Sequence, residues 1–187
     1  PEIAYECSLC SHCTAVCPFG VDPNGLFLGM RTAAYQSDSG NLMAPYKMLL
    51  GYEARGNSSL FRFFGLSGKS PSVFFPGCSL PGYNPDAVFS LIQWLRSRDP
   101  SLGVVLSCCG KPSHDLGRKE AFHEMFNTLL ARFREHSVER IITACPNCHK
   151  VFATYAEDME VVSAYQMLAR DSSMLPAPCG YSSPMLI

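Results

Sequence analysis

The ten cysteines are the residues of this chain best suited to chemistry, and four of them lie in one short run near the N-terminus. The run reads Cys7-x2-Cys10-x2-Cys13-x3-Cys17-Pro18. Thiolates at this spacing wrap a loop around a 4Fe–4S cubane, and the proline turns the chain away. Four thiolates can also hold a structural zinc ion, which is the alternative. The spacing therefore predicts a cubane cluster at Cys7, Cys10, Cys13 and Cys17.

The fourth ligand of this cluster is an open question. The run resembles that of bacterial ferredoxins, and in two-cluster ferredoxins the last cysteine binds the other cluster. Cys7, Cys10 and Cys13 would then need a thiolate from elsewhere. The chain has no second run of this kind and starts at Pro1 rather than at Met. We expect a second run upstream; the alternatives are that Cys17 or a distant cysteine completes a single site.

Five further cysteines each come shortly after a short apolar segment. The segments 72–75, 103–106 and 140–143 predict buried strands, and apolar periodicity between them predicts helices, the clearest over 122–133. Alternating strands and helices indicate right-handed crossovers and a mostly parallel sheet, with ligands outside the carboxyl ends of the strands. If the three strands are neighbours, one sheet edge receives five thiols: Cys78, Cys108, Cys109, Cys145 and Cys148. The alternative is coincidental placement at turns.

Five thiolates exceed the four that a tetrahedral zinc ion accepts, and one cubane also needs fewer. The surplus predicts an unusual cluster. Adjacent Cys108 and Cys109 cannot point the same way in an extended strand. The chain must therefore leave strand geometry after Leu106, and Gly110 supplies the freedom to do so.

The elements around these cysteines predict an α/β protein. We expect a small ferredoxin-like α-helical iron–sulfur domain at 1–40, with a helix over 22–39 whose apolar face carries Leu26, Phe27, Met30 and Ala34. Residues 41–70 are expected to be a connector with one or two helical turns. Residues 71–187 are expected to form a Rossmann-like parallel-sheet domain, with later elements at 151–156, 160–164 and 165–170. The Leu60–Phe64 run is expected to pack on this protein or a partner; a membrane-surface patch is the alternative.

The second cysteine group resembles the cysteine-rich CCG domain of heterodisulfide reductase B- and D-type subunits. Similar domains occur in iron–sulfur subunits of anaerobic glycerol-3-phosphate dehydrogenase, glycolate oxidase and lactate-utilisation proteins. The resemblance rests on Pro76-Gly77-Cys78, on Cys108-Cys109-Gly110-Lys111-Pro112 and on Cys145-Pro146-Asn147-Cys148, preceded by the ferredoxin-type run.

The resemblance implies that Cys78, Cys108, Cys109, Cys145 and Cys148 hold a second iron–sulfur cluster, of the non-cubane 4Fe–4S type, which reduces a disulfide. Some relatives place zinc or another cluster in such a site, so zinc stays an alternative. Members of the family usually carry two CCG domains, whereas this chain has one. Cys179-Gly180 would lead into a second repeat, and the chain is expected to be a fragment.

Several basic residues lie beside the motif cysteines. His12, His114 and His149 would donate hydrogen bonds to cluster sulfur or deliver a proton, unless they are solvated loop residues. Lys111 and Lys150 would offset the negative charge of the thiolates, or extend into solvent.

Composition excludes some function classes. The net charge of −1 argues against nucleic acid as a partner, and no apolar run is long enough to span a membrane. Only 17% of residues are charged, which suggests contact with partner subunits. No dinucleotide-binding glycine motif is present, so flavin or NAD would be bound by a partner. We expect a cytoplasmic protein, attached to the inner membrane only through such a partner.

The function expected from this resemblance is electron transfer. The leading hypothesis is an iron–sulfur subunit that reduces a disulfide within a larger complex containing a flavoprotein or a further iron–sulfur subunit. The alternative is a relay between a flavin dehydrogenase, of the glycolate, lactate or glycerol-3-phosphate type, and a quinone. A second alternative is a non-redox module stapled by zinc.

Overall fold

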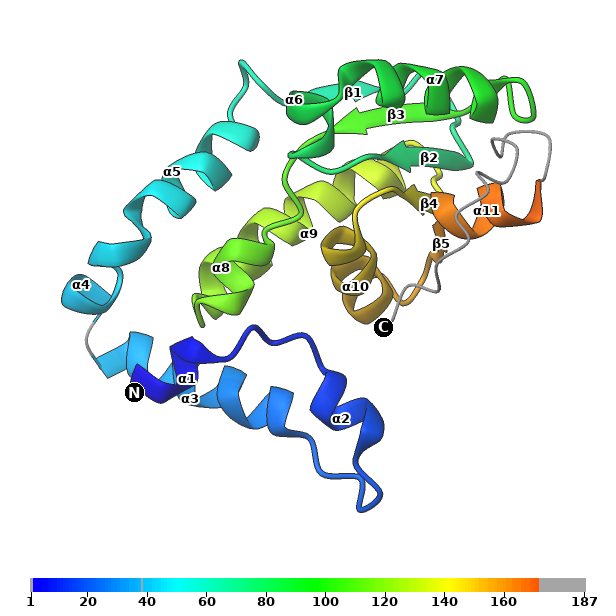
Figure 1. Cartoon of the computed structure of the whole chain (residues 1–187). Coiled ribbons are helices and arrows are strands. Elements are labelled where there is room, and N and C mark those ends of the chain that lie inside the picture. Colours follow the sequence, from blue (N-terminus) through cyan, green and yellow to red (C-terminus); the bar gives the residue numbers. More distant parts are fainter. Residues whose placement is uncertain (1, 38, 172–187) are drawn as a thin grey trace.

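A five-stranded sheet organises the chain, as seen in a computed structural model that describes residues 2–37 and 39–171 (Figure 1). The strand order is β1-β3-β2-β4-β5. Four strands are parallel, namely β2 (Ser72–Phe75), β3 (Gly103–Leu106), β4 (Arg140–Thr143) and β5 (Glu160–Ser163). The predicted α/β class, with a mostly parallel sheet, is confirmed.

Helices cover both faces of the sheet because the central strands are buried on both sides. On one face, Val73 and Phe75 pack against α9 (Lys119–Glu135) and α10 (Pro146–Tyr155). On the other face, Phe74 packs against α7 (Pro85–Arg96) and α11 (Ala164–Arg170). The predicted apolar stripe of α9 is buried at Phe122, Phe126, Leu129, Leu130 and Phe133.

The segment before β2 contains more regular structure than predicted. It holds α4 (Ser39–Leu42), a 3-10 turn η1 (Ala44–Tyr46), α5 (Lys47–Gly56) and β1 (Phe63–Gly65). Strand β1 lies antiparallel to β3, with Phe64 opposite Val105 and partly buried against the core. The Leu60–Phe64 run thus packs on this protein at Phe64, while Leu60 and Phe61 are exposed.

The N-terminal cysteine run lies among α1 (Glu2–Glu6), α2 (His12–Val16) and α3 (Pro23–Ser37), below α8 and α10 in Figure 1. The predicted helix over 22–39 is confirmed as α3. Its predicted apolar face, however, is not the face that is buried. Leu26 is 64% exposed and Met30 36%, whereas Arg31 is only 5% exposed. Arg31 tolerates burial because its guanidinium donates to the carbonyls of Ala4, Cys7 and Asp115.

Three helices near the cysteines differ from the prediction. Short helices α6 (Leu80–Tyr83) and α8 (Lys111–Asp115) follow the first two strand ends, and α10 begins at Pro146 rather than at 151. Cys148 therefore lies in the first turn of a helix. Across the described residues, no helix combines the length and apolarity needed to cross a bilayer. Cys179, where a second repeat is expected to start, lies outside these residues.

Candidate metal centre

Three neighbouring parallel strands bring the second group of cysteines to one edge of the sheet. Strands β3, β2 and β4 are adjacent, and all three run in the same direction. Cys78 follows β2, Cys108 and Cys109 follow β3, and Cys145 follows β4. The prediction that the three strands are parallel neighbours is confirmed.

The five thiols form one continuous row. Neighbouring thiols along it shift one another's pKa values: Cys78 and Cys108, Cys108 and Cys109, Cys109 and Cys148, and Cys148 and Cys145. All five are free thiols, and Cys108, Cys109 and Cys148 are buried. The sheet edge therefore gathers sulfur from three strand ends into a single group.

Glycines make room for this row. Gly77 has φ +89, and a Cβ added there would lie 3.1 Å from Cys145 Cβ and 3.2 Å from Cys148 Sγ. A Cβ on Gly56, at the end of α5, would lie 3.4 Å from Cys108 Cβ and 3.8 Å from Cys78 Cβ. Gly110 has φ +79 and turns the chain into α8, as predicted from the adjacent Cys108 and Cys109.

The hydrogen bonds divide the thiols into two kinds. The bond to Cys148 is the main cause that lowers the pKa of Cys145 to about 6. Bonds from Cys108 and Cys148 lower the pKa of Cys109, against the effect of burial. The pKa values of Cys78 and Cys148 are raised, mainly by their thiol neighbours and also by burial. The bond to Cys109 raises the pKa of Cys108 to about 12.

A cavity of about 390 Å³ lies against this row and reaches the N-terminal run. Its wall contains all five cysteines of the row together with Cys7, and the two cationic residues Arg31 and Lys111. The Arg31 guanidinium also lies over the ring of Tyr5, 5.1 Å from its centroid. The two cysteine groups, predicted as separate sites, thus share a cavity through Cys7.

The ferredoxin-type run lies mostly at the surface. Cys10 and Cys13 are exposed, whereas Cys7 and Cys17 are half-buried. Leu9 and Ser11, on either side of Cys10, have φ values of 53 and 64, in the left-handed region that non-glycine residues avoid. The backbone of this loop is therefore held by contacts with the rest of the protein.

The donor set fits an iron–sulfur group, because every member of the row is a free thiol. Across residues 2–37 and 39–171, no three Cys, His, Asp or Glu side chains converge as the ligands of a single metal ion. The thiols instead extend in a row along a cavity wall, and thiolates are the ligands of iron–sulfur clusters. The thiols of this site suit metal or iron–sulfur binding.

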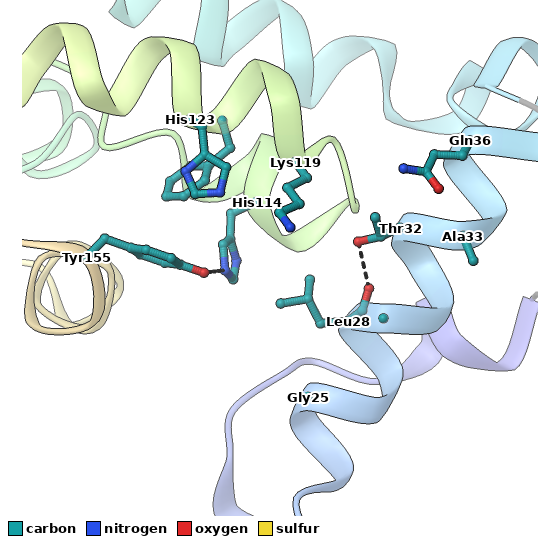
Figure 2. A pocket seen from close by; sticks show the side chains of 11 residues that line it. Gly25, Leu28, Thr32, Ala33, Gln36, His114, Lys119, His123 and Tyr155 are labelled. Atoms are coloured by element: carbon teal, nitrogen blue, oxygen red, sulfur yellow. Dashed lines mark hydrogen bonds between the residues drawn. The ribbon is translucent and has the colours of Figure 1, made fainter.

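The basic residues near the cysteines are held by specific contacts. His114 Nδ1 lies 2.8 Å from Asp115 Oδ1. Its Nε2 lies 2.8 Å from Tyr155 Oη, as Figure 2 shows. Lys111 pairs with the other oxygen of Asp115. Burial raises the pKa of the Asp115 carboxyl, but its bonds with His114 and Lys111 outweigh this and lower the pKa overall. His114 and Lys111 are therefore not solvated loop residues.

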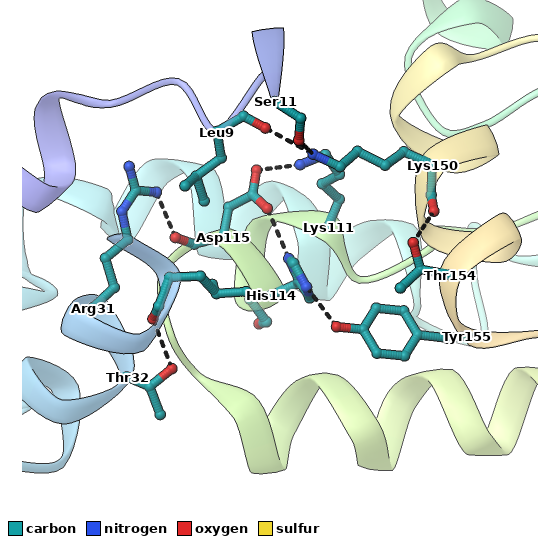
Figure 3. A network of polar contacts seen from close by, with 12 residues as sticks. Leu9, Ser11, Arg31, Thr32, Lys111, His114, Asp115, Lys150, Thr154 and Tyr155 are labelled. Carbon is teal, nitrogen blue, oxygen red and sulfur yellow. Dashed lines mark hydrogen bonds and ion pairs between the residues drawn. The ribbon is translucent and has the colours of Figure 1, made fainter. Parts of the chain in front are cut away.

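The remaining basic residues differ from one another. His149 Nδ1 lies 3.1 Å from the hydroxyl of Thr143, and Lys150 reaches the N-terminal loop (Figure 3). His12 is exposed. On the far side of α8, His114 also lines a second cavity of about 460 Å³ between α3 and α9 (Figure 2). Sequence reasoning missed Arg31, Asp115 and Tyr155, because no cysteine lies beside them in the chain.

Comparison with protein families identifies one domain. Residues 72–153 match the family model described as CCG, a cysteine-rich domain, which contains all five cysteines of the row. This domain occurs in heterodisulfide reductase-like subunits and indicates metal or iron–sulfur binding in a subunit of oxidoreductase type. Comparison with curated proteins and with solved structures gives no match.

Proposed function

We propose that this chain is an iron–sulfur electron-transfer subunit that reduces a disulfide at the CCG cysteines within a larger oxidoreductase complex. The observation that carries the proposal is the continuous row of thiols from Cys78 to Cys145 on a cavity that Cys7 also lines. In this proposal the row holds a non-cubane 4Fe–4S cluster, and Cys7, Cys10, Cys13 and Cys17 hold a cubane. The clusters supply single electrons when bound.

The cavity has features that a disulfide substrate would need. Its volume of about 390 Å³ falls within the range of small-molecule and cofactor sites. Reduction of a disulfide consumes two electrons and two protons and yields two thiols. Arg31, Lys111 and the Asp115 carboxylate that pairs with Lys111 give the cavity wall one net positive charge, which would stabilise the thiolate that forms when the S–S bond breaks.

The surface around the N-terminal run supports a partner subunit as the electron donor. Phe19 is 88% exposed, and Val16, Val21 and Leu26 are also exposed beside Cys13 and Cys17. Apolar side chains gathered at a surface site are typical of protein interfaces. We propose a flavoprotein or a further iron–sulfur subunit as this partner. The same surface supports the second candidate, a relay from a flavin dehydrogenase to a quinone.

An anaerobic assay separates these candidates. The chain is reconstituted with iron and sulfide, supplied with electrons by dithionite-reduced methyl viologen, and offered either hydroxyethyl disulfide or a soluble naphthoquinone, with each rate corrected for the direct reaction of the dye with that acceptor. We expect disulfide reduction that is lost in Cys109→Ser, and no turnover of the quinone. Quinone reduction without disulfide reduction would favour the relay. Stoichiometric zinc without acid-labile sulfide would support a structural module instead.

A further inference from the structure

A lysine of the CCG domain reaches into the N-terminal cysteine loop. Lys150 lies on α10, two residues after Cys148, and its Nζ donates to Leu9 O at 2.8 Å and to Ser11 Oγ at 2.6 Å (Figure 3). These bonds join residues 141 and 139 positions apart in the chain. One side chain therefore connects the helix that carries Cys148 to the loop that carries Cys10.

The loop that Lys150 binds has a costly backbone conformation. Leu9 and Ser11 both have positive φ, in the left-handed region that non-glycine residues avoid. Such residues persist only where the surroundings determine them. Lys150 contacts both of the strained residues, and the Leu9 side chain is buried at 3% exposure. The positions of Cys7, Cys10 and Cys13 around a cluster depend on these two residues.

The charge of Lys150 also bears on this loop. The ammonium donates to the residues on either side of Cys10, so its positive charge lies beside the loop that carries the proposed cluster ligands. A nearby cation stabilises whichever form of a neighbouring centre carries more negative charge. For an iron–sulfur cluster, that form is the reduced one.

We propose that Lys150 is a positioning residue for the N-terminal cluster: it fixes the Leu9–Ser11 turn around Cys10, and its ammonium favours the reduced cluster. The inference rests on the cubane of the proposed function. It also makes α10 a direct link between the two cysteine groups, since Cys148 and Lys150 lie in the same helix.

The test compares three variants of the full chain. Lys150→Met removes the charge and both hydrogen bonds at similar length, Lys150→Arg keeps charge and donors, and Lys119→Met removes an exposed lysine from α9 as the control. Amide hydrogen exchange over residues 8–12 is measured in the chain as purified. The midpoint potential of the cubane is measured by redox titration with electron paramagnetic resonance after anaerobic reconstitution.

We expect Lys150→Met to speed exchange over residues 8–12 and to disfavour cluster reduction about fivefold. That factor corresponds to roughly 40 mV for a one-electron couple. Lys150→Arg should keep exchange over residues 8–12 and the midpoint potential close to those of the unmodified chain. Lys119→Met should match the unmodified chain in both measurements.

Unchanged exchange and potential in Lys150→Met would overturn the proposal. Faster exchange with an unchanged potential would also overturn it, because Lys150 would then be a structural contact only. If the unmodified chain binds no iron at the N-terminal run, the proposed function fails there, and the electrostatic role of Lys150 fails with it. Unchanged exchange would then show that Lys150 does not position the loop either.

Discussion

Replacing Gly77 with alanine should disturb the cysteine row specifically. The added Cβ would meet Cys145 Cβ at 3.1 Å and Cys148 Sγ at 3.2 Å, so both cysteines must move by a few tenths of an ångström. Alanine at φ +89 adds a backbone penalty of about 1–2 kcal/mol. For a chain of this size, that penalty alone lowers the melting temperature by roughly 2–8 °C.

Gly68→Ala provides the matched control. Gly68 has φ +62 but nothing within 4 Å of its would-be Cβ, so this variant carries the backbone penalty without the clash. We expect both variants to lose stability, measured by chemical denaturation. Only Gly77→Ala should also lose iron and sulfide at the CCG site after anaerobic reconstitution. Equal iron content and equal visible spectra in the two variants would refute the packing argument.

Three further predictions concern stability. The Glu53 carboxylate accepts hydrogen bonds from the amide and the hydroxyl of Ser113, and burial raises the pKa of this carboxyl. The folded chain therefore holds a proton on Glu53 at pH values where the unfolded chain has lost it. The free energy of unfolding should fall as pH rises above about 4.5. Glu53→Gln should flatten this pH dependence in denaturation curves, and parallel curves for both chains would contradict it. Asn84→Ala removes the N-cap hydrogen bond that Asn84 Oδ1 accepts from Ala87 N. The free energy of unfolding should fall by about 1 kcal/mol in the same denaturation measurement. No loss would show that the cap is dispensable. Phe126→Ala, at a 2% exposed core position, should cost about 3–5 kcal/mol, and a cost below 1 kcal/mol would contradict the packing described.

The sheet and its cysteines could be predicted because their signals are local. Each parallel strand is a short apolar segment, and the cysteines follow within a few residues, so parallel order alone brings them to one edge. The turn after Leu106 could likewise be predicted, because two adjacent cysteines cannot point the same way in a strand, and Gly110 takes up that turn at φ +79.

The groups around the cysteines could not be predicted because their partners are distant in the chain. Arg31 binds the carbonyl of Asp115 across 84 positions, and Tyr155 meets His114 across 41. The pattern of α3 favours burial of Leu26, yet hydrogen bonds to three carbonyls bury Arg31 instead. Strand β1 was missed because its three residues are too few to show an alternating apolar pattern, and Leu60 and Phe61 shortly before it are exposed.

Iron and acid-labile sulfide content of Cys109→Ser tests the central claim most directly. Cys109 lies in the middle of the row, between the thiols of Cys108 and Cys148. If the five cysteines hold one cluster, the variant should lose about four irons per chain relative to the unmodified protein while keeping the cubane signal of the N-terminal run. Unchanged iron and sulfide in Cys109→Ser would contradict the account.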